Sequence, residues 1–423
     1  MMRPFEGIRV IDITHVLAGP FAAYQLAVLG ADVIKVEHPD DPDQSRGSGT
    51  DKELNRHNMG TAFLTQASNK RSITLDLKLP KDRDILKKLV ATADVLVENY
   101  RPGAFEALGL GYEAMAAINP RLIYASFSAF GQRGPRGKQT AYDHVIQATS
   151  GIMAMTGTQD VHPVKLGAPA VDYATGITGA FALASALFQR ERTGKGQLID
   201  MAMLDVAMIL MSSHLTGYLR NGVQPKPHGN SHPHATNSAF ATKSGMVMLG
   251  ASNLRQQRRL WTVLERPDMI KRSNDERDAD HAREIAVLTE IMLTRSADEW
   301  EEFLQARHVP AARMRTMAEA VADPQLTSRG IIHRPPPGSR VGSACRWRRS
   351  LLPTAVLGLI RHRPRSASIM KRSSANSASV DCGSNRPRRL RRALSAATSA
   401  VRSAAGRSRA RSRWRWPPSA GKC

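Results

Sequence analysis

Segments with strand and helix character alternate through the first 150 residues of this chain. Short runs rich in β-branched residues occupy positions 8–13, 32–36, 72–77, 94–97 and 122–126. Helical patterns fall between them at 21–29, after an Ala-Gly-Pro turn at 18–20, and at 82–92. This alternation predicts βαβ units and therefore an α/β fold with a parallel sheet. Such a sheet binds its ligand at the carboxyl ends of the strands, where the loops converge.

The pattern of elements changes in the second half of the chain. A helix rich in small residues is predicted at 175–189, and a strand–helix unit follows it as far as Leu210. Beyond Met246, a strand precedes helical patterns at 254–264, 281–292 and 297–307, which predicts a smaller α+β domain. We therefore expect a large domain at 1–220, a linker and small domain at 221–333, and a tail at 334–423.

The net charge of +23 is concentrated in the tail. Residues 334–423 contain 22 of the 60 Lys and Arg residues but only one of the 37 acids, Asp381. Residues 1–333 therefore hold 38 basic and 36 acidic side chains, a net charge of +2. A strongly basic protein suggests a nucleic-acid or acidic-membrane partner, but this inference does not extend to the nearly neutral first 333 residues.

The positions of the cysteines and the lengths of the apolar runs limit the kinds of site and the location that this protein can have. All three cysteines, Cys345, Cys382 and Cys423, lie in the tail, so a disulfide framework or a cysteine-based metal site is excluded from 1–333. The N-terminus has no signal-peptide pattern, and the apolar run 351–360 is too short to span a bilayer. We expect a cytoplasmic protein with no membrane partner.

Seven segments of the chain are similar, in register, to one family. They are GIRVIDITHVLAGPFAAYQLAVLGADVIKVEHP (7–39), NKRSITLDLK (69–78), ADVLVENYRPGA (93–104), NPRLIYASFSAFG (119–131), AYDHVIQATSG (141–151), DYATGITGAFALASALFQRERTGKGQLIDMAMLD (172–205) and ADPQLTSRGIIH (322–333). They resemble the class III coenzyme A transferases, which include formyl-CoA transferase and CaiB/BaiF-like proteins. The resemblance implies a Rossmann-like large domain, a small domain, and an interlocked homodimer in which each chain threads the other.

Asp172 is the candidate catalytic residue. It precedes a predicted helix in the segment GAPAVDYATG, where an Asp commonly caps the free N–H groups of the first turn. An Asp is also a nucleophile that is ionised at neutral pH, since its ordinary pKa is about 3.9. The resemblance implies the second role. In that role Asp172 forms a mixed anhydride with the donor acyl group, then an aspartyl-CoA thioester from which an incoming carboxylate collects the CoA.

Tyr142 helps to separate two reactions of this superfamily. Related racemases carry a His-Asp pair where this chain has Tyr142-Asp143, and proton transfer beside a thioester needs a group that titrates near neutrality. His144 would point the same way as Tyr142 only if the segment were a strand. We therefore expect a CoA transferase whose partners are an acyl-CoA and a small carboxylic acid. The alternatives are an acyl-CoA racemase or epimerase, and a basic protein that binds nucleic acid through its tail.

CoA is the expected cosubstrate, with no cofactor bound permanently. The resemblance places the CoA contacts at Leu17, Ala18, His38, Leu75, Lys78, Asn99, Tyr100, Arg101, Lys138 and Ala141. Position 38 often carries Arg in the family, and the His found here is a weaker phosphate partner. Without the resemblance, Lys78, Arg101 and Lys138 would be interpreted as solvated surface charges.

A histidine-rich segment, HGNSHPHATN, occupies 228–237 within a loop rich in Pro and Gly. It contains no acidic or cysteine partner, so we expect no metal there. A similar loop in related transferases lies near the acyl group, which makes Gly229, Asn230 and His232 candidate substrate-side residues together with Tyr142. Neither the GxGxxG nor the GxxxxGK[ST] loop is present, so NAD and ATP are not indicated.

After His333 the resemblance stops and the composition shifts abruptly to Arg, Ser, Ala and Pro. Such a composition is typical of disorder. The tail could be a nucleic-acid-binding arm, a membrane-surface segment, or the product of a shifted reading frame. We favour the shifted frame because the change coincides with the loss of family register, and we expect no specific nucleic-acid partner.

Overall fold

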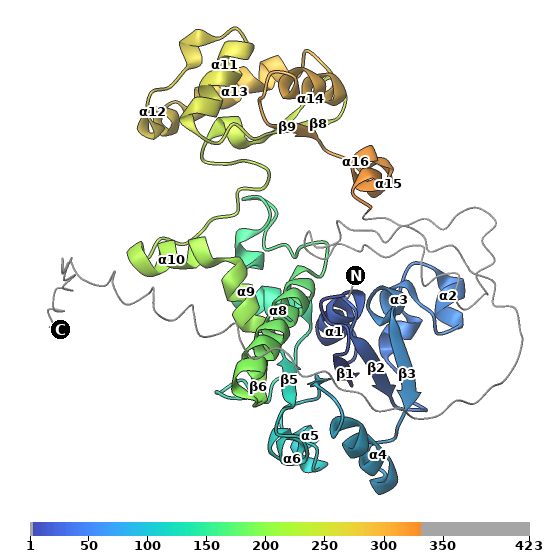
Figure 1. Cartoon of the computed structure of the whole chain (residues 1–423). Coiled ribbons are helices and arrows are strands. Elements are labelled where there is room, and N and C mark those ends of the chain that lie inside the picture. The colour runs from blue at the N-terminus through green and yellow to red at the C-terminus, as the bar shows by residue number, and fades with distance from the viewer. Residues whose placement is uncertain (1–2, 331–423) are drawn as a thin grey trace, which may run out of the picture. The chain divides into compact units, whose positions relative to one another are not determined.

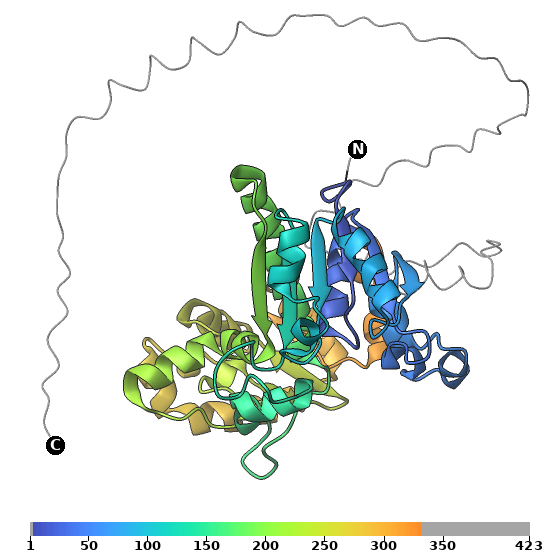
Figure 2. The same ribbon diagram turned by 90° about the horizontal axis from the view of Figure 1, so that it is seen from below.

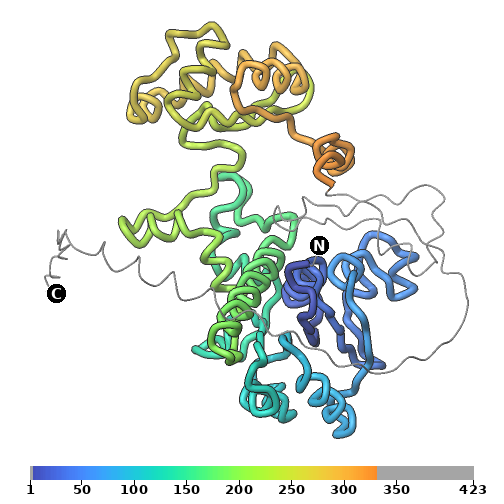
Figure 3. The backbone as a smooth tube through the Cα atoms, viewed as in Figure 1, coloured from blue at the N-terminus to red at the C-terminus, as the bar shows by residue number. Residues whose placement is uncertain are grey.

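A computed structural model of the chain describes residues 3–330 (Figure 1). The predictions made for the tail at 334–423 concern residues outside this range. The path of the described chain can be followed by colour in Figure 3, from the blue N-terminal strands to the orange helices that precede residue 330.

A six-stranded parallel sheet forms the first part of the structure, as the sequence predicts. Its order is β3-β2-β1-β4-β5-β6, and every neighbouring pair is parallel. The strands are β1 (Arg9–Asp12), β2 (Asp32–Glu37), β3 (Lys70–Thr74), β4 (Val95–Glu98), β5 (Ile123–Ser128) and β6 (Gln197–Ala202). The chain builds outward from β1 to β3 and then continues on the other side of β1 with β4. Strand order therefore reverses between β1 and β4, where ligands of open α/β sheets bind.

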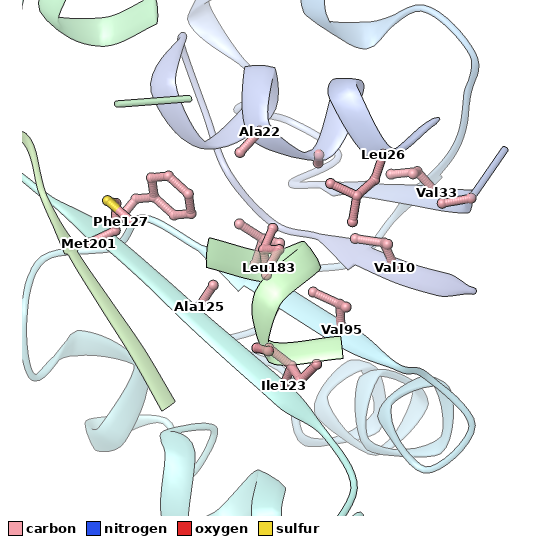
Figure 4. Close-up of a cluster of buried hydrophobic side chains, with 14 of the residues drawn as sticks. Val10, Ala22, Leu26, Val33, Val95, Ile123, Ala125, Phe127, Leu183 and Met201 are labelled. Atoms are coloured by element: carbon pink, nitrogen blue, oxygen red, sulfur yellow. The ribbon is translucent and has the colours of Figure 1, made fainter. Parts of the chain in front are cut away.

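Helices cover both faces of this sheet because its strands are apolar on both sides. Successive strand residues point to opposite faces, so Val10 and Ile11 are both buried but belong to different clusters. On one face, α1 (Ala18–Val28) and α8 (Ala170–Thr193) lie side by side (Figures 1 and 2). Figure 4 shows Leu26 of α1 and Leu183 of α8 among the strand residues of that face. The other face packs against residues of α4 (Pro80–Val90) and α6 (Tyr112–Ile118).

The first part of the structure also contains shorter helices. They are η1 (Gln44–Gly47), α2 (Lys52–Arg56), α3 (Thr61–Ala67), α5 (Ala104–Ala107), α7 (Asp143–Ser150), η2 (Met153–Met155), α9 (Met203–Leu210) and α10 (Ser212–Asn221). Among the described residues, α8 alone has the length and apolar character of a membrane span, with a mean hydropathy of 1.3 over its best window. Core helices of soluble proteins pass the same test, so the observation carries little weight.

A second, antiparallel sheet has the order β7-β8-β9 and its own hydrophobic core. Its strands are β7 (Ala239–Ala241), β8 (Met246–Leu249) and β9 (Ala311–Arg313). The helices of this part are η3 (Ala235–Asn237), α11 (Leu254–Val263), η4 (Pro267–Met269), α12 (Asn274–Ala279), α13 (His281–Met292), α14 (Ala297–Gln305), α15 (Met317–Ala322) and α16 (Pro324–Ser328). Trp261, Leu288 and Trp300 are almost fully buried at its centre. The predicted smaller α+β part is therefore present.

Two helix starts differ from the sequence prediction. The expected turn at 18–20 is instead the first turn of α1. Pro20 has no backbone N–H, but N–H groups in the first turn of a helix have no acceptor within the helix, so no hydrogen bond is lost. Helix α8 begins at Ala170 rather than at residue 175. Asp172 consequently lies inside the first turn of α8, and the residue at the N-cap is Pro169. The interpretation of Asp172 as an N-cap is wrong.

Candidate active site

A pocket of about 720 Å³ opens beside the carboxyl ends of β1 and β4, where the strand order reverses. The loop after β1 contributes residues 15–18, and the loop after β4 contributes residues 99–101. Residues 127–129 at the end of β5 and residues 140–142 before α7 complete much of the wall. Helix α8 contributes the side chain of Asp172 to this wall. Convergence of several loops at one end of a parallel sheet is the expected location of a binding site.

Eight of the site residues predicted from the sequence line this one pocket. They are Leu17, Ala18, Asn99, Tyr100, Arg101, Ala141, Tyr142 and Asp172. These residues span more than 150 positions of the chain, so only the fold brings them together. The sequence reasoning did not single out His15, Asp41 and Gln44, which also line the pocket. His15 and Asp41 each lie within three residues of a predicted contact, and this proximity was the signal available.

Four predicted CoA contacts lie outside the lining of this pocket. The Nδ1 atom of His38 accepts hydrogen bonds from the N–H groups of Asp40 and Asp41, both at 3.1 Å, which places His38 directly beside the pocket wall. Leu75 is buried in the hydrophobic cluster on one face of the sheet. The N–H of Lys78 donates to Asp76 at 2.9 Å. Lys138 lines a separate pocket of about 460 Å³. Their contacts with CoA stay predictions.

The predicted substrate-side loop also lies outside the pocket lining. The Gly229 N–H donates to the Gly157 carbonyl at 2.5 Å, and the His232 N–H donates to the Ser238 hydroxyl at 2.9 Å. Among residues 3–330, no group of three or more His, Cys, Asp or Glu side chains is arranged to hold a metal ion. The role of Gly229, Asn230 and His232 in binding substrate stays a prediction.

A buried network fixes the position of Asp172. The backbone N–H of Asp172 donates to Oδ2 of Asp143 at 3.0 Å. Asp143 begins α7, is 6% exposed, and accepts a second hydrogen bond from the amide of Gln147. The amide oxygen of Gln147 in turn accepts the Leu166 N–H at 2.9 Å. Helix α7 and the loop before α8 therefore hold the first turn of α8 in place through two buried side chains.

Asp172 differs electrostatically from an ordinary aspartate. Burial is the larger cause and the nearby negative charge of Asp143 the smaller one, and together they raise its pKa to about 7. The N-terminal end of a helix favours a negative charge, but burial outweighs that effect here. The expectation of a fully ionised carboxylate at neutral pH is therefore wrong, because the side chain is partly protonated near pH 7. Perturbed pKa values of this kind concentrate at functional sites.

His144 adopts helical geometry, whereas the backbone of Tyr142 is extended. Tyr142 is the N-cap residue of α7, and His144 lies in the first turn. Their rings stack at a centroid distance of 6.3 Å, and Tyr142 is 54% exposed. The Tyr142 hydroxyl accepts a hydrogen bond from Gln44 at 3.4 Å. The strand alignment that would have made His144 a substitute base is absent from this segment.

Comparisons with known proteins identify the family of this chain. The model of CoA-transferase family III matches residues 5–354, which extends past His333, where the sequence resemblance was expected to end. The chain is 37% identical to the succinate–glutarate CoA-transferase of Agrobacterium fabrum, over 78% of this chain and 84% of that protein. It is also 37% identical to the acetyl-CoA:oxalate CoA-transferase of Acetobacter aceti, over 78% of this chain and 85% of that protein.

A solved structure agrees with these sequence matches. The crystal structure of a CaiB/BaiF family protein from Brucella suis superposes with a TM-score of 0.70 at 36% identity, covering 79% of this chain and 90% of that one. The agreement therefore extends from sequence to the fold that builds the Asp172 pocket. The chain belongs to CoA-transferase family III and is a CoA transferase.

Proposed function

We propose that this enzyme moves CoA from an acyl-CoA to a free carboxylic acid, with Asp172 carrying the acyl group and then the CoA. The observation that supports this most directly is the position of Asp172. Its carboxylate is the half-buried, pKa-shifted acid of α8 in the wall of a pocket at the reversal point of the sheet. Weakly solvated carboxylates are better nucleophiles than solvated ones.

The chemistry balances with Asp172 and CoA alone. The Asp172 carboxylate attacks the thioester carbonyl, the C–S bond breaks, and CoA thiolate leaves a mixed anhydride on the enzyme. The thiolate then attacks the Asp172 carbonyl of that anhydride and releases the donor acid, which leaves an aspartyl-CoA thioester. The acceptor carboxylate attacks this thioester to form a second anhydride and thiolate. Attack of the thiolate on the acceptor carbonyl yields the new acyl-CoA and frees Asp172.

The pocket offers groups suited to each part of the reaction. The first turn of α1 lines it, and N–H groups at a helix N-terminus stabilise developing oxyanions. Arg101 is an exposed cation of the same wall that suits the phosphates of CoA. We assign Gly229, Asn230 and His232 to the acyl or acceptor side on the family resemblance. CoA is then a cosubstrate, and no other cofactor takes part in the steps.

We further propose that the enzyme acts as a homodimer in the cytoplasm, with a large domain at 1–220 and a small domain at 221–333. Large apolar side chains are exposed along α8 and α10. Phe181 is 73% exposed, Phe188 is 61% exposed and Leu219 is 74% exposed. Exposed large apolar side chains that share one interface are typical of proteins that associate. A second copy of this chain is the occupant that the family resemblance supports.

The transfer itself is tested by product analysis. Purified protein is incubated with pairs of acyl-CoA and acid, beginning with the pairs named for the relatives, succinyl-CoA with glutarate and acetyl-CoA with oxalate. We expect a new acyl-CoA of the mass set by the acceptor. With an ¹⁸O-labelled acceptor in a single turnover, the peptide that contains Asp172 should gain one ¹⁸O atom. Transfer without label in that peptide would contradict the anhydride route.

A further inference from the structure

Val16 has a backbone conformation that its side chain disfavours. Its φ is +71°, in the left-handed region where a β-branched residue is a rare outlier. Residues of this kind persist only where surrounding contacts hold them, and they concentrate at functional sites. Val16 belongs to the loop between β1 and α1 and lines the Asp172 pocket. The strained residue is therefore part of the pocket wall.

Three side chains from other elements hold the backbone of His15 and Val16. The carboxamide of Asn99 accepts a hydrogen bond from the His15 N–H and donates one to the His15 carbonyl, both at 2.9 Å. The Val16 N–H donates to the carboxylate of Asp43, at 3.1 and 3.3 Å from its two oxygens. The Val16 carbonyl accepts a hydrogen bond from the amide of Gln66. All four backbone polar groups of these two residues are thus bonded to side chains.

Two of the holding side chains are themselves fixed in the interior. Gln66 of α3 is 2% exposed and Asp43 is 1% exposed. The ammonium of Lys35, on β2, lies 3.0 Å from the Asp43 carboxylate and donates to the Thr14 carbonyl at 2.7 Å. Separating the partners of a buried ion pair is strongly unfavourable. The β1–α1 loop is therefore anchored to the sheet rather than left free at its surface.

We infer that Asn99, Asp43 and Gln66 form a backbone clamp that keeps Val16 in its left-handed conformation and so positions the β1–α1 loop in the Asp172 pocket. In this role Asn99 is a positioning residue, because His15 engages both ends of its carboxamide. The family resemblance had instead implied that Asn99 contacts CoA. Without the clamp, Val16 relaxes to a negative φ and displaces Leu17 and Ala18, which line the same pocket. Small displacements of a catalytic wall lower kcat steeply.

The clamp is tested by measuring the effect of Asn99→Ala in three backgrounds: Val16, Val16→Gly and Val16→Ala. Glycine adopts positive φ without strain, whereas alanine shortens the side chain but keeps the strain. With Val16 present, Asn99→Ala should lower kcat by about tenfold or more while the Kd for CoA changes by less than about threefold. The loss of kcat should shrink to about threefold or less in Val16→Gly and persist in Val16→Ala. A rise in the Kd for CoA that is equal in all three backgrounds would instead make Asn99 a CoA contact and overturn the clamp.

A second variant removes the clamp from outside the pocket. Gln66 does not line the pocket, so Gln66→Leu has no direct contact with substrate to lose. It should lower kcat without raising the Kd for CoA, and Val16→Gly should again reduce the loss. A Gln66→Leu protein with the wild-type Tm and an unchanged kcat would contradict the clamp.

The clamp can also be tested without turnover, which separates it from the proposed transfer reaction on which its catalytic effect rests. Hydrogen exchange of the peptide covering 13–18 reports on the His15 and Val16 amides, which donate to Asn99 and Asp43. Asn99→Ala and Gln66→Leu should each speed this exchange, and Val16→Gly should not restore the lost His15 bond. If wild-type protein transferred no CoA, the proposed function would fail while this readout still decided the clamp. Unchanged exchange in both variants would overturn it.

Discussion

At the scale of single residues, Asp172 is defined by its surroundings rather than by its place in the sequence. Its segment shows an Asp near a helix start, and this pattern also fits an N-cap. The structure places it in the first turn of α8, after the N-cap residue Pro169, and its backbone N–H donates a hydrogen bond to Asp143. Asp143 lies 29 residues earlier in the chain. A contact of that separation, and the burial that raises the pKa to about 7, arise from tertiary packing and could not be predicted from local sequence.

The raised pKa of Asp172 predicts how transfer depends on pH. The attacking form is the carboxylate, so kcat/KM should fall as pH decreases through about 7. Asp143→Asn removes the negative charge that helps to raise this pKa, so the acid limb should move to lower pH. The measurement is a pH profile of both proteins between pH 5 and 9.

Glu98 is the second carboxyl to consider in that profile, because burial raises its pKa to about 7 as well. The carboxylate of Glu98 accepts a hydrogen bond from the Tyr100 N–H at 2.7 Å. Asp143 is not among the groups that shift the pKa of Glu98. An acid limb that keeps its position in Asp143→Asn would assign the limb to Glu98 or another group rather than to Asp172.

The same pKa shift has a consequence for stability. The folded-state pKa of Asp172 lies above its ordinary value, so the folded protein favours the protonated form, and stability falls as pH rises from about 4 through about 7. Asp172→Asn removes this cost. The variant should have a Tm higher than wild type by a few degrees at pH 8 and by less at pH 5, measured by thermal unfolding. A larger gain at pH 5 than at pH 8 would contradict the sign of the shift.

At the scale of elements, the strands were easier to predict than the helix starts. Runs of β-branched residues correspond to β1, β2, β4 and β5 within about two residues, because buried parallel strands require them on both faces. The predicted strand at 72–77 is shifted from β3 at Lys70–Thr74, since β3 is an edge strand whose exposed residues give a weaker apolar pattern. The starts of α1 and α8 were missed because Pro20 and Pro169 mark both turns and first helical turns.

Close contact between α1 and α8 predicts the effect of a small substitution at Gly176. A Cβ at this position would lie 2.9 Å from the Ala18 carbonyl oxygen, a backbone atom, and 2.9 Å from the Phe21 ring. Gly176→Ala should therefore push the first turn of α1 away from α8, with a loss of about 1–3 kcal/mol of stability and of kcat. Urea unfolding and transfer assays measure the two effects.

Gly217 supplies the matched control for this substitution. It also lies within a helix, α10, but a Cβ there would meet no atom within 4 Å. Gly217→Ala should be neutral or slightly stabilising. Equal losses in the two alanine variants would indicate a general intolerance of the helices rather than the contact between α1 and α8.

At the scale of the whole molecule, the exposed apolar side chains of α8 predict self-association. Phe181 and Phe188 are each more than half exposed on a helix whose Leu183 is fully buried. Phe181→Ser should shift a dimer toward monomer in analytical ultracentrifugation without lowering the stability of the subunit core. Leu183→Ala on the same helix should instead cost about 2–5 kcal/mol of stability. A wild-type protein that remains monomeric at high concentration would contradict the proposed dimer.

Eight of the 19 residues that line the pocket could be predicted from sequence once the family resemblance was recognised. The resemblance did not reveal the mutual arrangement of the backbone. Asn99 could be named as a pocket residue, but its bonds to His15 depend on the juxtaposition of β1 and β4. Likewise, the left-handed conformation of Val16 could not be predicted from the sequence, since Val is among the residues least suited to a positive φ.

The central claim, that Asp172 carries the acyl chemistry, is tested most directly by Asp172→Ala with transfer and CoA binding measured together. Asp205→Ala is the matched control, since Asp205 lies exposed in the first turn of α9 and outside the pocket lining. Asp172→Ala should lower transfer at least about 10³-fold while the Kd for CoA stays within about threefold of wild type, and Asp205→Ala should match wild type. Transfer by Asp172→Ala within about tenfold of the wild-type rate would contradict the assignment of Asp172 as the nucleophile.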